Sequence, residues 1–250
     1  MDLMPIKVAA LILKHHGIAM CIVGELALNY YNVPRVCHVS RPVCSTRSRM
    51  TDDNQDLEIC VPKSSSSVAA NLLCSTGLFN SCEMGGDFNN FTEYKRDIPR
   101  VRTTCWCPPQ TIVIFNAAFF GFDSIEDVLV PPMSEGNIHI SKEIELNRED
   151  ITNLHLPRLA PLLKGLATRF LDTKDDVAMI GVEQLVDGMD LDEAWVERQL
   201  GGSDAALLDL VMSQIRSKKS RIDYYADNKI TCFVSDQEEA EKIRLIPGFE

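Results

Sequence analysis

The sequence lacks a long hydrophobic run. Its longest apolar stretch, Ile112 to Phe122, is much shorter than the roughly 20 residues that a transmembrane helix needs. The first residues also lack the charged-then-apolar pattern of a secretory signal. We therefore expect a protein without a membrane span, located in the cytosol, with the nucleus as the alternative.

Positive charge is also scarce, since 25 Lys and Arg stand against 36 Asp and Glu, which gives a net charge of −11. An acidic chain is repelled by a nucleic-acid backbone, so long DNA or RNA is not the expected partner. A small molecule or a nucleotide suits this charge better. The oligomeric state is left open.

The cysteines lack the spacing of a metal site or a disulfide framework. There are nine, an odd number, scattered along a chain that is large enough to fold without crosslinks. Cys105 and Cys107 form the one close pair, and no second Cys or His pair follows at ligand spacing. We expect reduced thiols.

A substantial core is present, because 45% of the 250 residues are hydrophobic. The first half alternates helix and strand signals. Helices are predicted over 5–17, after Gly24 and over 64–77, and strands over 18–23, 56–61, 99–106 and 111–120, with a loop over 80–97. From about residue 156, apolar residues recur at helical spacing over 156–173, 174–189, 190–200 and 203–227.

These patterns predict an α/β fold, with a mixed sheet flanked by helices and a helical C-terminal region. The expected organisation is an α/β domain over 1–125, a connecting segment over 126–155 and a helical domain over 156–250.

Two carboxylates and a glycine form the candidate site. Asp56 and Glu58 are two apart on a predicted strand, so both side chains leave the same face, as the ligands of a Mg²⁺ ion would. Gly24 precedes a helix N-terminus, which favours an anion such as phosphate. The simpler interpretation is a solvated acidic strand and an ordinary turn.

The residues "IVGELALNYYNVPRV" and "DLEICV" resemble the nucleotidyltransferase fold family, in its minimal, antitoxin-like or aminoglycoside-type branch. The resemblance implies transfer of a nucleoside monophosphate from a nucleoside triphosphate to an unknown acceptor, with Mg²⁺. Asp56 and Glu58 would be the catalytic residues and the metal ligands. Gly24 and Arg35 would contact the nucleotide, and the basic run that contains Lys95 and Arg96 offers further phosphate contacts.

The spacing differs from the family pattern, because Asp56 lies 32 residues after Gly24. Removing the 17 residues Val39 to Gln55 shortens this separation to 32 − 17 = 15 and restores the family register. The segment begins with Val-Ser and ends with Gln. Both ends can be encoded by codons that match the boundary sequences of an intron. We interpret it as a translated retained intron, expected to be disordered, in a chain that resembles uncharacterised fungal nucleotidyltransferase-domain proteins.

Two further departures weaken the prediction of catalysis. Glu25 replaces the second Gly or Ser of the family, and the strand predicted over 111–120 carries no third carboxylate, with Asp97 and Asp123 as substitutes that lack positional support. They favour an alternative, a non-catalytic relative that binds a nucleotide or a protein. A third alternative is an interaction protein with an exposed acidic strand.

Overall fold

The computed structural model describes residues 3–34, 56–82, 92–132, 138–144, 146, 148–223, 225 and 227–250. Over these residues the chain forms a five-stranded mixed sheet, ten α-helices and three short 3₁₀ helices. The predicted fold class, a mixed α/β fold with a helical C-terminal region, is confirmed.

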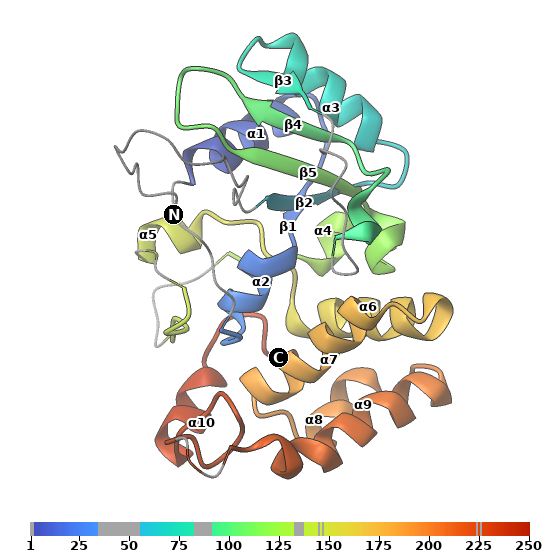
Figure 1. Ribbon diagram of the computed structural model, residues 1–250, viewed down its shortest axis with the longest axis vertical. Helices are drawn as coiled ribbons and strands as arrows, with labels where there is room; N and C mark the ends of the chain where they lie inside the picture. The colour runs from blue at the N-terminus through green and yellow to red at the C-terminus, as the bar shows by residue number, and fades with distance from the viewer. Residues whose placement is uncertain are drawn as a thin grey trace, which may run out of the picture.

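The strands and the helices that accompany them occupy the first half of the chain (Figure 1). In order they are α1 (Met4–His15), β1 (Cys21–Ile22), α2 (Gly24–Tyr30), β2 (Leu57–Val61), α3 (Ser66–Ser75), β3 (Phe79–Ser81), η1 (Glu93–Lys95), β4 (Arg100–Thr103), β5 (Thr111–Asn116), η2 (Ala117–Phe120) and α4 (Ile125–Val128). The remaining elements are α5 (Arg148–Thr152), α6 (Leu159–Thr173), α7 (Asp176–Gly188), α8 (Glu193–Leu200), α9 (Ala205–Ser217), η3 (Lys218–Arg221) and α10 (Gln237–Ile243).

The sheet has the strand order β1-β2-β5-β4-β3. The central strands β2 and β5 are parallel, and the other neighbours are antiparallel. Both central strands are buried almost throughout, which explains their nearly continuous apolar sequences. The register places Glu58 of β2 beside Val113 of β5, and Val113 beside Arg100 of β4, so these three side chains share one face.

Helix α3 makes the widest contact with the sheet. α3 packs on β2, β3, β4 and β5, and α1 lies against α3. In Figure 1 the sheet with α1 and α3 forms the upper layer, the helices α6 to α9 form the lower layer, and α2 and α4 lie between them. The sheet side of the molecule and the helical side therefore meet next to α2.

Hydrogen bonds to backbone carbonyls join the first half of the chain to the second. The Ile22 amide of β1 donates to the His155 carbonyl at 2.7 Å, and the Tyr30 hydroxyl of α2 donates to the Pro247 carbonyl at 2.9 Å. Within the helical part, the Leu159 amide and the Trp195 indole donate to the carbonyls of Gly248 and Phe249, at 2.8 Å and 2.9 Å. One continuous hydrophobic core extends through both layers.

Several predicted elements change length. The strand expected over 18–23 is reduced to Cys21–Ile22, and the strand expected over 111–120 ends at Asn116, whose side chain accepts a hydrogen bond from the Phe119 amide and caps η2. The helix expected over 203–227 ends at Ser217 and continues as η3. The helix α10 was not predicted, and the expected loop over 80–97 contains η1.

No helix in the described part of the chain is long and apolar enough to cross a membrane. The proposed insert over 39–55 lies outside the described residues. The domain boundaries remain a prediction, although all strands come before residue 117 and the four longest C-terminal helices after residue 158.

Candidate functional site

Gly24 brings the backbone into contact with an acidic side chain. It is the first residue of α2, just after β1, and its φ is +64°, a region that glycine occupies without steric cost. A Cβ atom added there would lie 2.1 Å from Oε2 of Glu58 and 2.5 Å from its Cδ. Both the torsion angle and the proximity of Glu58 therefore require glycine at this position.

The two carboxylates of the predicted site face the same cation. The Nζ atom of Lys95 lies 2.5 Å from Oε1 of Glu58 and 3.6 Å from Oδ2 of Asp56. The expectation that both carboxylates leave one face of the strand is confirmed. The interpretation as a solvated acidic strand is wrong for Glu58, because its side chain is only 5% exposed.

Lys95 is held at its backbone as well as at its ammonium group. It ends η1, where its carbonyl accepts a hydrogen bond from the Arg100 guanidinium at 2.5 Å, and its side chain is 12% exposed. Burial alone would lower the pKa of Lys95, but the charge of Glu58, supported by Tyr94 and Asp56, outweighs burial and raises that pKa. The Lys95 side chain therefore stays protonated in the folded protein.

An aromatic and guanidinium cluster adjoins the Lys95 and Glu58 pair. The Tyr94 ring stacks near Phe115 and Phe119, and its hydroxyl lies 3.5 Å from Glu58 Oε1. Burial, followed by the charge of Glu58, raises the pKa of Tyr94. The Arg169 guanidinium of α6 lies 4.7 Å from the centre of the Tyr94 ring and 4.3 Å from that of Phe119.

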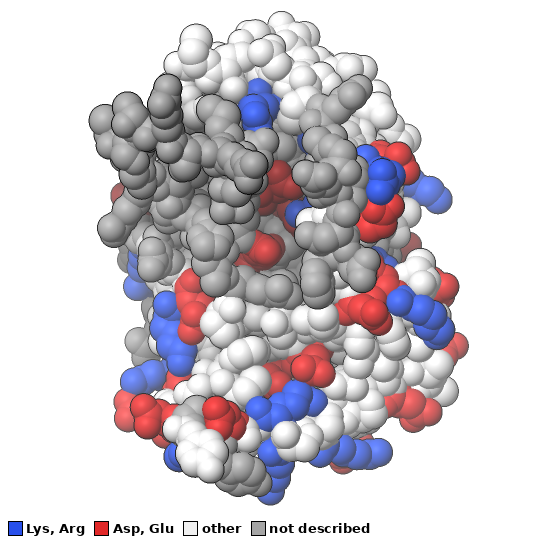
Figure 2. Space-filling view, in the orientation of Figure 1, with Lys and Arg blue, Asp and Glu red and all other residues white. Residues whose placement is uncertain are grey.

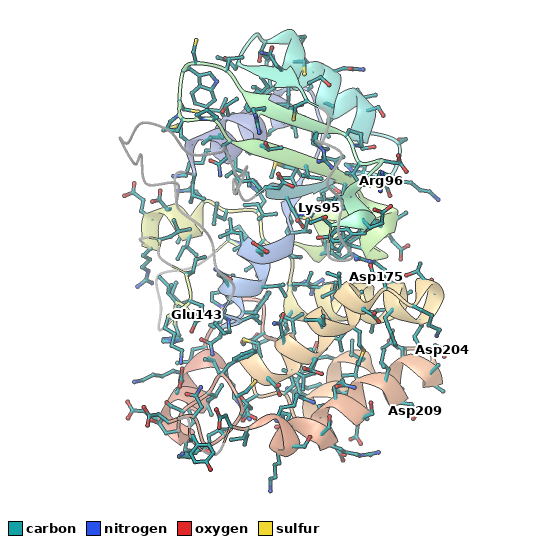
Figure 3. All side chains as sticks on the ribbon, in the orientation of Figure 1. Lys95, Arg96, Glu143, Asp175, Asp204 and Asp209 are labelled. Carbon is teal, nitrogen blue, oxygen red and sulfur yellow. The ribbon has the colours of Figure 1, made fainter. Side chains whose placement is uncertain are left out.

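Arg169 is fixed on its other side by the start of α7. Its Nε donates to Asp175 Oδ2 at 2.6 Å, and the same carboxylate caps α7 by accepting a hydrogen bond from the Val177 amide at 2.9 Å. In Figure 3 Asp175 lies where the helical layer begins, below Lys95. The helical layer therefore presents a positioned guanidinium to the sheet layer.

A cavity of about 240 Å³ lies between these groups. Its lining combines polar and charged side chains with apolar ones. The polar lining is Gly24, Glu25, Glu58, Thr92, Tyr94, Lys95 and Arg169, and the apolar lining is Leu28, Phe120, Leu162, Leu166, Val177, Ile180 and Gly181. In Figure 2 acidic side chains are visible near the middle of this face of the molecule. A second space of about 480 Å³ shares the Tyr94 and Arg169 side chains with this cavity.

The predicted site residues are only partly brought together. Gly24, Glu58 and Lys95 line the cavity, and Asp56 contacts Lys95. Arg96 does not line it: Figure 3 shows Arg96 at the edge of the molecule, where its Nε donates to Glu93 Oε1 at 2.7 Å. Arg35 lies outside the described residues.

Two groups at the site were not predicted from the sequence. Tyr94 lies in a segment read as a loop, and Arg169 is one polar residue on an amphipathic helix, where nothing in the local pattern distinguishes it. Both become evident only when the two layers pack together.

The described residues do not fit a Mg²⁺ site. Lys95 already occupies the space between Asp56 and Glu58, and the positions beside Glu58 across the sheet are Val113 and Arg100, so no third carboxylate is there. Asp97 and Asp123 are exposed and do not line the cavity. In the described part of the chain, no group of three His, Cys, Asp or Glu residues could hold a metal ion.

Comparison with known proteins adds no relative. No protein-family model matches the chain, and no curated protein matches its sequence. The resemblance to nucleotidyltransferases therefore rests on the motif residues themselves.

Proposed function

We propose that the protein is a non-catalytic relative of the nucleotidyltransferases that binds a small organic ligand in the cavity between the sheet and helices α6 and α7. A nucleoside or nucleotide is the class that the resemblance favours. The observation that carries this proposal is the cavity itself, which joins Gly24 and Glu58 of the motif to side chains of the helical layer.

The lining suits a small, flat molecule with a polar edge. Tyr94, Phe120 and the planar guanidinium of Arg169 supply surfaces against which a ring can stack, and the polar lining supplies charged and hydroxyl groups. With a volume of about 240 Å³, the cavity lies below the roughly 300–1,000 Å³ that is usual for drug-sized ligands. A nucleobase or nucleoside is therefore favoured over a larger molecule.

The charges argue against catalysis on a triphosphate. Glu25 lines the cavity at the glycine turn, where its negative charge repels a polyphosphate, and the cations that line the cavity, Lys95 and Arg169, are already paired with Glu58 and Asp175. A divalent cation that could screen this repulsion has no suitable set of ligands among the described residues. The alternative of a binding protein thus takes precedence over the transferase that the resemblance implies.

Ligand binding can be tested by thermal unfolding of the full chain with a panel of nucleosides and nucleotides. We expect at least one to raise Tm, and Val177→Phe, which adds a ring to the cavity lining, to abolish that shift. Val68→Phe is the matched control, because Val68 is 51% exposed on α3 and should leave the shift intact. If no compound in the panel raises Tm of the wild type, the proposal fails.

The transferase alternative needs its own assay, since binding does not demonstrate turnover. Release of pyrophosphate from a nucleoside triphosphate, abolished by Glu58→Gln, would establish catalysis and contradict the proposed binding role. We expect no release above the background without protein.

A further inference from the structure

The contacts of Lys95 suggest a specific role for this residue within the proposed ligand site. It is not a surface lysine that happens to meet an acid, since its ammonium contacts two carboxylates and its carbonyl is held by Arg100, which is itself 6% exposed. Arg100 and Glu58 flank Val113 in the sheet register, so the sheet determines the position of both the lysine backbone and its main partner.

The carboxylates of Asp56 and Glu58 need a cation that neutralises their charge. Asp56 and Glu58 are 19% and 5% exposed, and paired carboxylates with so little contact to water need a positive partner. In sites that bind Mg²⁺ or Mn²⁺, the metal ion supplies this charge. Here the Lys95 ammonium is at hydrogen-bonding distance from Glu58 and close to Asp56.

We propose that Lys95 is a built-in cation that takes the place of a divalent metal ion between Asp56 and Glu58. The carboxylate pair is thereby made independent of metal, and ligands enter the adjoining cavity without Mg²⁺. Ligand entry without Mg²⁺ rests on the proposed function. The replacement of a metal ion by Lys95 concerns the lysine and the two carboxylates alone.

Removal of the lysine should convert the pair into a metal site. Without the ammonium, the two carboxylates that leave the same face of the strand become available to a divalent cation as oxygen ligands. We expect Lys95→Ala to bind Mn²⁺ about 10- to 100-fold more tightly than the wild type does, the factor that corresponds to displacing one charged hydrogen bond.

The experiment is titration of MnCl₂ into the full chain, followed by calorimetry and by the electron paramagnetic resonance signal of free Mn²⁺. Lys142→Ala is the matched control, because Lys142 pairs with Glu239 at the surface and is 49% exposed. We expect Lys142→Ala to bind Mn²⁺ no more tightly than the wild type. The double variant Lys95→Ala with Glu58→Gln should lose the higher Mn²⁺ affinity of Lys95→Ala. If Lys95→Ala does not fold alone, recovery of its cooperative unfolding on addition of Mn²⁺, again dependent on Glu58, is the equivalent result.

Two results would overturn the inference. One is Mn²⁺ binding by the wild type that Glu58→Gln abolishes, since the pair would then accept a metal in the presence of Lys95. The other is a folded Lys95→Ala that binds Mn²⁺ no better than the wild type. Neither depends on the nucleoside panel, so a failed ligand search removes the proposed function and leaves the role of Lys95 intact. Conversely, nucleoside shifts that require Mg²⁺ contradict metal-free binding even if a ligand is found.

Discussion

Substitution of Gly24 by alanine tests how closely the glycine turn and the acidic strand are coupled. The new Cβ would lie 2.1 Å from a Glu58 oxygen, so the carboxylate must move. The left-handed backbone costs an L-residue about 1–2 kcal/mol. Moving Glu58 also weakens its charged hydrogen bond to Lys95, which is worth about 1.5–3 kcal/mol. Together these predict a loss of about 2.5–5 kcal/mol in the free energy of unfolding.

A matched glycine separates the two contributions. Gly17 has φ at +71° and no atom within 4 Å of an added Cβ, so Gly17→Ala should cost only the backbone contribution, about 1–2 kcal/mol. Urea denaturation of the wild type and both variants gives the free energies directly. In a Glu58→Ala background, the cost of Gly24→Ala should fall to that of Gly17→Ala. Equal costs for the two glycine variants in the wild-type background would refute the predicted contact.

Three further predictions concern the protons of Lys95 and Tyr94, the contacts of Arg169 and the messenger RNA. The raised pKa values of Lys95 and Tyr94 mean that both protons stay bound in the folded chain above their ordinary values of 10.5 and 10.0. Their contribution to stability is therefore complete below about pH 10 and is lost as the pH rises above it. The free energy of unfolding, measured at a series of alkaline pH values, should fall less steeply in Lys95→Met or Tyr94→Phe than in the wild type, by about 1.4 kcal/mol per pH unit. Arg169→Leu should cost about 1.5–3 kcal/mol by chemical denaturation, whereas Arg216→Leu, which breaks a pair of side chains at least half exposed, should cost under about 1 kcal/mol. Sequencing of the messenger RNA should show a main transcript without the segment between codons 38 and 56, and its retention there would contradict the intron hypothesis.

The fold could be predicted from the sequence where a local pattern is strong. The helices α6 and α7 and the strand that carries Glu58 follow from apolar spacing, and the structure has them close to the predicted positions. Short elements were less predictable: β1 keeps only Cys21 and Ile22 of a six-residue apolar run, and these two residues pair with Cys60 and Ile59 of β2.

The site was predictable only as far as its motif. Gly24, Asp56 and Glu58 were found from residue type and spacing, and the shared face of the carboxylates followed from strand geometry. Lys95 was identified as a basic residue but assigned to phosphate, because the sequence does not show that it folds back onto the acidic strand. Its neighbour Arg96 has the same charge and faces solvent, a difference that is set by the η1 turn and by Arg100.

In the proposed site, Lys95 and not a metal ion lies between the carboxylates of Asp56 and Glu58. A crystal structure of the wild-type chain, grown with MnCl₂ and a nucleoside triphosphate and measured for the anomalous signal of manganese, examines it directly. We predict no anomalous peak beside Asp56 and Glu58, with the Lys95 ammonium hydrogen-bonded to Glu58. A manganese peak coordinated by both carboxylates, with Lys95 displaced, would contradict the account.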